Sequence, residues 1–244
     1  MTSALTRAAT LLAACAALPA AAATTQLLPS GAVFWAGDSA YLSAADVPAG
    51  FFAGGVPAFL DTLEDGSLDG GLTTTDASVI IGSAFVGTRD SVDADDGRID
   101  GSCGPQTSTS GCGSLFNGNG GRLTVTFQGA GAPTAFGLVW TDGAGSINVT
   151  VSATAADGSS LGSVTYSGIG DGSNGATTAE DRFFGVQFAG GVKSLTVVNS
   201  GGGIEVDHLQ YGVMAAVPEP GTWALMAIGA LALGPLAGRR RRSF

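Results

Sequence analysis

The sequence predicts an all-β fold, an antiparallel β-sandwich of the jelly-roll kind. Apolar and polar residues alternate with a period of two in one segment after another, as they do in strands with one buried face. The dipeptide Asp-Gly, a strong signal for a hairpin turn, occurs seven times among the 244 residues. The 40 glycines further disfavour a helical domain, because glycine in a helix lowers its stability.

The clearest expected strands are residues 122–128 and 146–152, in which every second side chain is apolar. Further strands are expected at residues 33–35, 78–86, 136–140, 161–166, 182–188, 193–199 and 204–211. About nine strands exceed the seven of a constant-type immunoglobulin domain. The chain also lacks the Cys-Trp-Cys framework of such domains, and these two observations together favour a jelly roll.

One short helix is expected within this β-rich chain, at residues 57–64. Period-two alternation is absent there, and Phe59, Leu60 and Leu63 are spaced as on one face of a helix. The rest of the region between residues 24 and 214 is assigned to a single domain, since one all-β domain commonly reaches this size.

The first residues predict a signal peptide that is cleaved after export. Arg7 precedes an apolar stretch at residues 8–18, and small residues then lead to Ala23 and a polar segment. This pattern assigns residues 1–23 to the signal peptide. Lipid attachment at Cys15 is the weaker alternative, because the residues after it remain apolar.

The region 215–244 predicts a transmembrane helix between two polar motifs. The motifs are Val217, Pro218, Glu219 and Pro220 before the helix and Arg239, Arg240, Arg241 and Arg242 after it. The apolar stretch of about 17 residues would span roughly 25 Å, just enough for a thin bilayer. Arginines after the helix would keep that end in the cytoplasm, with the domain on the other side.

These three parts in this order resemble the PEP-CTERM sorting signal over Val217–Arg242. The resemblance implies recognition by an exosortase, a membrane protease, with cleavage near Pro-Glu-Pro. It also implies a Gram-negative bacterium that makes exopolysaccharide, export across the inner membrane and a final location at the cell surface or outside the cell. Such signals follow many unrelated domains, so the resemblance leaves the function of residues 24–214 open.

The charge of the expected domain excludes nucleic acid as a partner. Residues 24–214 contain 19 acidic and 5 basic residues, a formal charge of −14. Binding a phosphate backbone requires the opposite sign. An acidic surface instead favours solubility and the binding of cations.

Two cysteines follow the expected signal peptide, Cys103 and Cys112, within a stretch rich in Gly, Ser and Thr. In an oxidising compartment such a pair predicts a structural disulfide, which would constrain a ring of about 10 residues by roughly 2–3 kcal/mol. A redox pair usually has two intervening residues, and a metal site needs more than two ligands, so both alternatives fit less well.

A cluster of five aspartates is the candidate metal site, with calcium as the candidate cofactor. Its members are Asp90, Asp93, Asp95, Asp96 and Asp100. Carboxylates this close repel one another, so the segment is either a solvated acidic loop or a site that collects a cation. Calcium takes 6–8 oxygen ligands, which aspartates and a glycine-rich backbone supply. Asp142, Glu180 and Asp181 could belong to this site or to a second one.

The sequence predicts that the domain is not an enzyme. The segment 158–162 matches the pattern Gly-x-Ser-x-Gly, but it joins two expected strands instead of a strand and a helix. His208 is the only histidine, and its neighbours Glu205 and Asp207 are expected not to converge with it, since adjacent strand residues face opposite ways. Aromatic residues are too scarce for the cleft of a glycosidase.

Three functions follow, of which the first is favoured. It is an exported surface or matrix protein with a non-enzymatic domain that associates with exopolysaccharide. The second is a calcium-dependent carbohydrate-binding module, which exposure of Trp35, Trp140 or Tyr211 beside the acidic loop would favour. The third is a secreted hydrolase, for which the sequence offers little catalytic chemistry.

Overall fold

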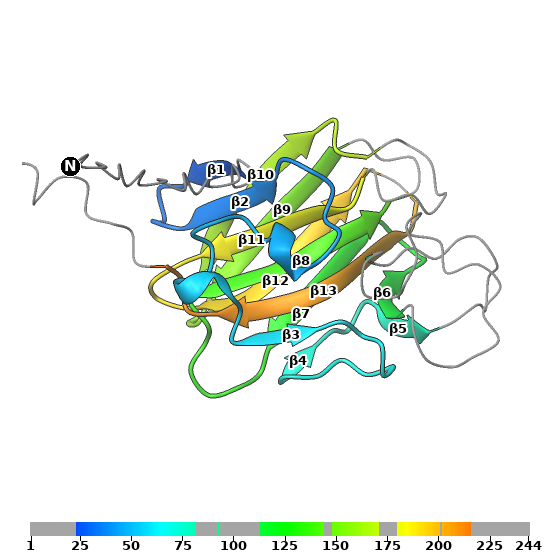
Figure 1. The fold of residues 1–244 in the computed structure, drawn as a ribbon, viewed down its shortest axis with the longest axis horizontal. Coiled ribbons are helices and arrows are strands. Elements are labelled where there is room, and N and C mark those ends of the chain that lie inside the picture. Colours follow the sequence, from blue (N-terminus) through cyan, green and yellow to red (C-terminus); the bar gives the residue numbers. More distant parts are fainter. Residues whose placement is uncertain are drawn as a thin grey trace, which may run out of the picture.

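The protein is a sandwich of two antiparallel sheets in a computed structural model (Figure 1). The structure describes residues 23–81, 92, 113–143, 148–170, 180–200 and 202–215. The eight-stranded sheet contains β1 (Ala23–Leu27), β2 (Val33–Gly37), β3 (Phe59–Asp61), β5 (Ser78–Ile81), β6 (Gly113–Asn117), β8 (Ala135–Asp142), β11 (Arg182–Gln187) and β13 (Ile204–Gly212). The five-stranded sheet contains β4 (Leu72–Thr73), β7 (Arg122–Phe127), β9 (Asn148–Ala155), β10 (Ser160–Ser167) and β12 (Val192–Asn199). The predicted sandwich is therefore confirmed.

The last eight strands have the order of a jelly roll. One sheet carries β6-β13-β8-β11 and the other β7-β12-β9-β10, with every neighbouring pair antiparallel. The chain crosses between the sheets at each connection except the β9–β10 hairpin. The earlier strands extend this framework: β2 and β1 continue the sheet beyond β11, β5 lies beside β6, and β4 lies beside β7.

Alternating side chains fill the space between the sheets. Leu123, Val125 and Phe127 of β7 point inward, and so do Phe136 and Trp140 of β8. Their burial removes large apolar surfaces from water, at roughly 25 cal/mol per Å². The period-two pattern of the sequence therefore corresponds to the inner face of each sheet.

The outer face of the eight-stranded sheet is also buried. An outer cluster, separate from the main core, contains Tyr41, Phe51, Phe52, Val92, Ala135, Val139 and Phe183. Three of its members, Tyr41, Phe51 and Phe52, belong to a covering segment, residues 38–58. This segment contains two single-turn 3₁₀ helices, Ala44–Asp46 and Ala53–Gly55. Gln187 of β11 holds this segment, because its Nε2 donates to the carbonyl oxygens of Gly50 (3.0 Å) and Phe51 (2.6 Å). All eight residues of β8 are consequently buried.

The predicted helix at residues 57–64 is wrong, because Phe59–Asp61 forms β3 and pairs with Leu209–Tyr211 of β13. The Asp61 carboxylate accepts hydrogen bonds from the N–H groups of Leu63 (3.0 Å) and Asp69 (2.7 Å), which favours a tight loop over a helix. Leu63 has a φ of 61°, in the left-handed region. Pairing with β13 outweighs the local helical spacing.

The Asp-Gly signal correctly predicts the β9–β10 hairpin. Gly158 has a φ of 84°, and its N–H donates to the carbonyl oxygen of Ala155 (2.9 Å). Asp157 Oδ1 accepts from the N–H (2.9 Å) and the hydroxyl (2.6 Å) of Ser159, and these bonds lower the pKa of Asp157. The Gly-x-Ser-x-Gly match at residues 158–162 thus includes the tip of a hairpin and the start of β10.

The expected signal peptide and sorting region lie outside the described residues, except for Ala23 and Ala215 at their boundaries. Within the described ranges, no helix is long and apolar enough to cross a membrane. The second half of the expected strand 78–86 and the first residues of the expected strand 146–152 also lie outside them. β1, β4 and β6 were not expected from the sequence.

The close packing of the outer cluster predicts that Gly137→Ala destabilises the protein. An added Cβ would lie 2.5 Å from the ring of Phe183, which packs edge to face on Phe51 at 4.9 Å. Overpacking of this kind costs about 1–3 kcal/mol, measurable as a lower free energy of unfolding in urea. Gly120→Ala is the control, because nothing lies within 4 Å of its added Cβ. Equal stability of the two variants would contradict the packing described.

Candidate functional site

Most of the site residues expected from sequence lie outside the described residues. This holds for the aspartates 90, 93, 95, 96 and 100, for both cysteines, Cys103 and Cys112, and for the motif residues 217–220 and 239–242. The structure therefore leaves the calcium site and the disulfide as predictions. It does describe one residue within the acidic segment, Val92.

Val92 connects the acidic segment to the outer face of β13. Its N–H donates to Asp207 Oδ2 at 2.9 Å, and its side chain is fully buried in the outer cluster. Val92 is thus held against the eight-stranded sheet.

A buried polar cluster, defined as Tyr41, Asp207, His208 and Gln210, lies at this anchor. The His208 ring contacts the Tyr41 hydroxyl through Nδ1 at 3.0 Å, and Gln210 Nε2 donates to the same hydroxyl at 3.2 Å. All four side chains are at most 2% exposed. The hydrogen bonds hold these polar groups in place where water cannot satisfy them.

A bulge in β13 brings Asp207 and His208 to the same face. The register against β8 shifts between Asp207 and Gln210, and His208 has a φ of 44°. Asp207 reaches Val92, whereas His208 reaches Tyr41, and both of these partners belong to the outer cluster. The expectation that adjacent residues face opposite ways is therefore wrong at this point.

The acidic residues near this cluster are buried. Asp142, Glu180 and Asp181 are at most 7% exposed. Glu205 accepts a hydrogen bond from the Ser114 hydroxyl. Among the residues that the structure describes, no three His, Cys, Asp or Glu side chains converge in a way that could hold a metal ion.

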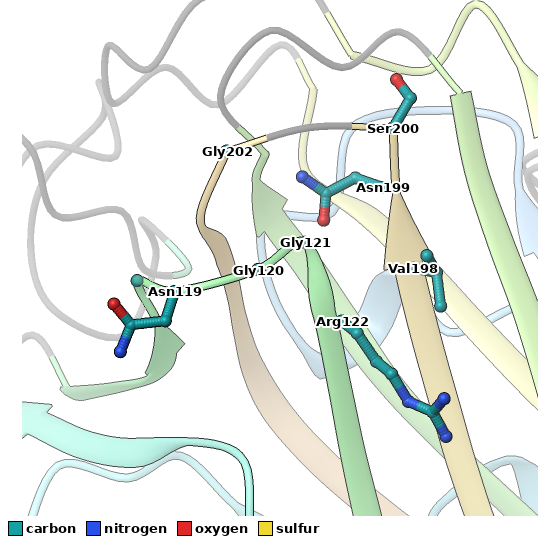
Figure 2. A pocket seen from close by; sticks show the side chains of 9 residues that line it. Asn119, Gly120, Gly121, Arg122, Val198, Asn199, Ser200 and Gly202 are labelled. Carbon is teal, nitrogen blue, oxygen red and sulfur yellow. The ribbon is translucent and has the colours of Figure 1, made fainter.

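A pocket of about 510 Å³ opens at one end of β7 and β12 (Figure 2). Asn199 donates its N–H to the carbonyl oxygen of Gly121 at 2.7 Å, and a Cβ on Gly121 would lie 2.8 Å from the Asn199 oxygen. Figure 2 shows that the Arg122 side chain extends along β12, away from Asn119 and Ser200. The glycines permit close strand approach, and among the described lining residues only Arg122 is charged.

The outer face of the five-stranded sheet carries a regular array of hydroxyl groups. We define this hydroxyl face by the hydroxyl side chains on the side of the sheet away from the core: Thr73, Thr124, Thr126, Thr150, Ser152, Thr154, Ser163, Thr165, Ser167, Ser194 and Thr196. Ser194 and Thr196, on the central strand β12, are only 9% and 7% exposed, and the others are more accessible. Their neighbours in each strand point into the core. Strand pairing aligns them in rows, one of which runs across β7, β12, β9 and β10 as Thr124, Thr196, Ser152 and Ser163.

Hydrogen bonds between hydroxyls hold this array in place. Thr124 and Thr196 are 3.0 Å apart through their Oγ1 atoms, and Thr154 Oγ1 lies 2.6 Å from Ser194 Oγ. Thr150 and Thr165 form a third pair at 2.8 Å. None of the five strands contains Asp or Glu. On a domain with a formal charge of −14, this sheet therefore contributes no negative charge.

The three aromatic residues whose exposure would favour a carbohydrate-binding module all make contacts within the protein. Trp140 is fully buried in the core. Trp35 is half-buried and donates through Nε1 to Gln187 Oε1 at 3.0 Å. Tyr211 donates to the carbonyl oxygen of Gly70 at 2.8 Å and stacks on Phe59 at 5.1 Å. None of them provides the exposed ring that would favour the carbohydrate-binding module.

A family model for the PEP-CTERM protein-sorting motif matches residues 216–242. The chain carries a PEP-CTERM sorting motif. The resemblance seen at Val217–Arg242 is therefore confirmed, and the motif implies an exported protein that is sorted by exosortase. Because the match lies beyond the jelly roll, the PEP-CTERM motif does not identify the domain's ligand. No curated protein of similar sequence was found.

Several solved structures match this chain at low similarity. The cleaved K2 adhesin domain of Lys-gingipain is 14% identical, with a TM-score of 0.37, over 64% of this chain and 97% of that one. The enzymatically active domain of tailspike protein 4 from bacteriophage CBA120 is 14% identical, with a TM-score of 0.32, over 63% and 21%. A xylan-binding domain from CBM 22 is 16% identical, with a TM-score of 0.26, over 66% and 97%.

The buried polar cluster predicts that Tyr41→Phe destabilises the protein. The variant removes the hydroxyl that contacts His208 and Gln210, and unpaired buried groups cost about 1–3 kcal/mol each. Urea unfolding should show a loss of this size. Tyr166→Phe is the matched control, because the Tyr166 hydroxyl has no hydrogen-bond partner among the described residues. If both variants lose the same stability, the hydrogen bonds of the Tyr41 hydroxyl do not stabilise the protein.

Proposed function

We propose that this chain is an exported surface or extracellular-matrix protein whose jelly-roll domain, without enzymatic activity, associates with a neutral exopolysaccharide. The PEP-CTERM motif supports export and exosortase processing. The hydroxyl face is the observation that supports the binding of a polysaccharide. The proposal includes removal of residues 1–23, anchoring by residues 215–244 until processing, and a disulfide between Cys103 and Cys112 formed after export.

The chemistry of the hydroxyl face suits a sugar polymer. Each hydroxyl both donates and accepts a hydrogen bond, as sugar hydroxyls do. Strands lie about 4.7–4.9 Å apart and outward residues about 6.6–6.8 Å apart along each strand, so the face offers a repeating pattern to a repeating ligand. Single contacts of this kind are weak, but many of them along one polymer strengthen binding.

The charge of the domain favours a neutral polymer over an anionic one. The formal charge of −14 repels uronate-rich or sulfated chains. The five strands of the hydroxyl face add no carboxylate to that charge, and Arg122 and Lys193 lie within them. A neutral chain therefore avoids repulsion and uses the hydroxyls directly.

The absence of enzymatic activity is supported by the surroundings of His208. A Ser-His-Asp mechanism needs a histidine beside an accessible nucleophile. The only histidine of the chain is 2% exposed, and its Nδ1 contacts the Tyr41 hydroxyl. That position suits a structural role in holding the covering segment to β13.

The test removes one complete row of hydroxyls. A row variant carries Thr124→Val, Thr196→Val, Ser152→Ala and Ser163→Ala, which keeps approximate shape and strand propensity. Loss of several hydrogen bonds of about 0.5–1.5 kcal/mol each predicts at least tenfold weaker retardation in affinity gels that contain neutral glucan, xylan or galactomannan.

The control for this test is Thr25→Val with Thr75→Val, which changes exposed threonines outside the hydroxyl face. Retardation of the control should equal that of the wild type. A wild type that no neutral polysaccharide retards, or a row variant retarded as strongly as the wild type, would show that the hydroxyl face does not bind such polymers.

A second candidate function, calcium binding by the acidic segment, is favoured by the anchoring of Val92. Five aspartates with Arg89 and Arg98 leave a local charge near −3. The bond from Val92 to Asp207 holds part of this segment against the domain, which reduces the entropy lost when a cation gathers several carboxylates. We propose that calcium binding there stabilises the folded protein.

Thermal unfolding tests the calcium proposal. A cation that binds only the folded state stabilises it by about 2.7 kcal/mol at a hundredfold excess over its dissociation constant. Millimolar calcium should raise the Tm by very roughly 5–10 °C over chelator, and magnesium should raise it less. The change of Asp93 and Asp95 to Asn should abolish the shift. An unchanged wild-type Tm would leave the solvated loop as the correct interpretation.

A further inference from the structure

A groove of about 650 Å³ lies where the edges of the two sheets meet. Thr24 of β1 and Gly37 of β2 line one side, and Thr165–Ser167 of β10 line the other. The adjacent β1, β2 and β10 are labelled in Figure 1. Clefts of roughly 300–1,000 Å³ are the size that holds small ligands. The groove has the volume for a sugar unit.

A cation and an anion both line this groove. Arg182 is half-buried at the start of β11, and its Nη1 donates to the carbonyl oxygen of Asp181 at 2.8 Å. Burial lowers the pKa of Arg182, and the charges of Asp181, Glu180 and Asp38 raise it. Asp38 is exposed and accepts from the Thr24 hydroxyl at 3.2 Å. The groove therefore presents fixed donors from Arg182 and acceptor oxygens from Asp38.

Tyr166 adds a buried hydroxyl. Its side chain is 6% exposed, its ring lies 5.2 Å from that of Phe184, and it belongs to the lining of the groove. The hydroxyl has no hydrogen-bond partner among the described residues. Burial raises the pKa of Tyr166, so the group remains a neutral hydroxyl. An unpaired buried hydroxyl costs about 1–3 kcal/mol, which a ligand oxygen can offset.

The charges around the groove select a neutral ligand. Among the described residues, the carboxylates of Asp181, Glu180 and Asp38 all act on the Arg182 guanidinium, so an anionic phosphate or uronate gains less there than the guanidinium alone would give it. Sugar hydroxyls can donate to the Asp38 carboxylate and accept from the Arg182 guanidinium. Thr165 and Ser167 belong both to the groove and to the hydroxyl face, which makes the two surfaces continuous.

We propose that this groove binds one neutral sugar unit of the polymer that lies across the hydroxyl face. The proposal rests on the function given above and adds to it a specific subsite formed by Asp38, Tyr166 and Arg182. The hydroxyl face supplies many equivalent contacts along the polymer. The groove supplies the contacts that distinguish one sugar from another.

Two single-atom changes test the subsite in the full-length protein. Tyr166→Phe removes only the hydroxyl, and Asp38→Asn removes only the negative charge and one acceptor. The probe is the neutral polysaccharide that retards the wild type. Each variant should bind it about tenfold more weakly, the equivalent of about 1.4 kcal/mol. Asp157→Asn, in the exposed β9–β10 turn, is the control and should bind as the wild type does.

The outcomes separate this proposal from the function on which it rests. If the row variant weakens binding while Tyr166→Phe and Asp38→Asn bind as the wild type does, the subsite is wrong and the hydroxyl face remains. If no neutral polysaccharide retards the wild type, both are wrong. Stronger retardation by polyuronate than by neutral polymers overturns the choice of a neutral sugar. Thermal unfolding of each variant checks that the fold is unchanged.

Discussion

The burial of both faces of β8 and β13 is the constraint on which the rest of the structure depends. The inner face of these strands packs against the five-stranded sheet, and the outer face packs against residues 38–58 and Val92. Because this covering segment has little regular structure, it is held by side-chain hydrogen bonds from the sheet. Gln187 binds the backbone at Gly50 and Phe51, and Asp207 binds Val92. A single layer of loops thus buries the outer face of β8 and β13.

This division assigns different tasks to the two sheets. The eight-stranded sheet holds the buried polar cluster around His208 and binds the backbone of Val92. The five-stranded sheet presents the hydroxyl face, and its edge at β10 leads into the groove beside Asp38. A domain with a formal charge of −14 is thereby able to offer a regular surface whose strands contain no carboxylate to a neutral polymer. The PEP-CTERM motif is consistent with this function, since it implies an exported protein that is sorted to the surface.

Local patterns in the sequence predict most of this fold, because strand alternation and Asp-Gly turns are local signals. They identify the strands from β7 to β13 and the β9–β10 hairpin, as well as the sorting motif at residues 216–242. They do not identify the helix-like segment 57–64 as β3, because its pairing partner, Leu209–Tyr211, lies far away in the chain. The bulge at His208 is hidden for a related reason, since only the register against β8 reveals it.

The candidate sites depend even more on non-local pairing. Alternating Thr and Ser residues are visible in the sequence of β7 and β9, but the rows of hydroxyls exist only through the register of four strands. The groove joins Asp38 to Tyr166 and Arg182, which no sequence spacing relates. The same limit applies to Trp140, which looks like a possible platform in the sequence and is a core residue in the structure.

Threonine-methyl NMR during titration with a neutral oligosaccharide tests the central claim most directly. Shift changes should concentrate on the methyl groups of Thr124, Thr150, Thr165 and Thr196, with Thr25 and Thr75 unchanged. Binding through the hydroxyl face predicts this distribution, because all four residues belong to adjacent strands of one sheet. Saturable changes confined to threonines outside the five-stranded sheet would contradict it and would place the ligand elsewhere on the domain.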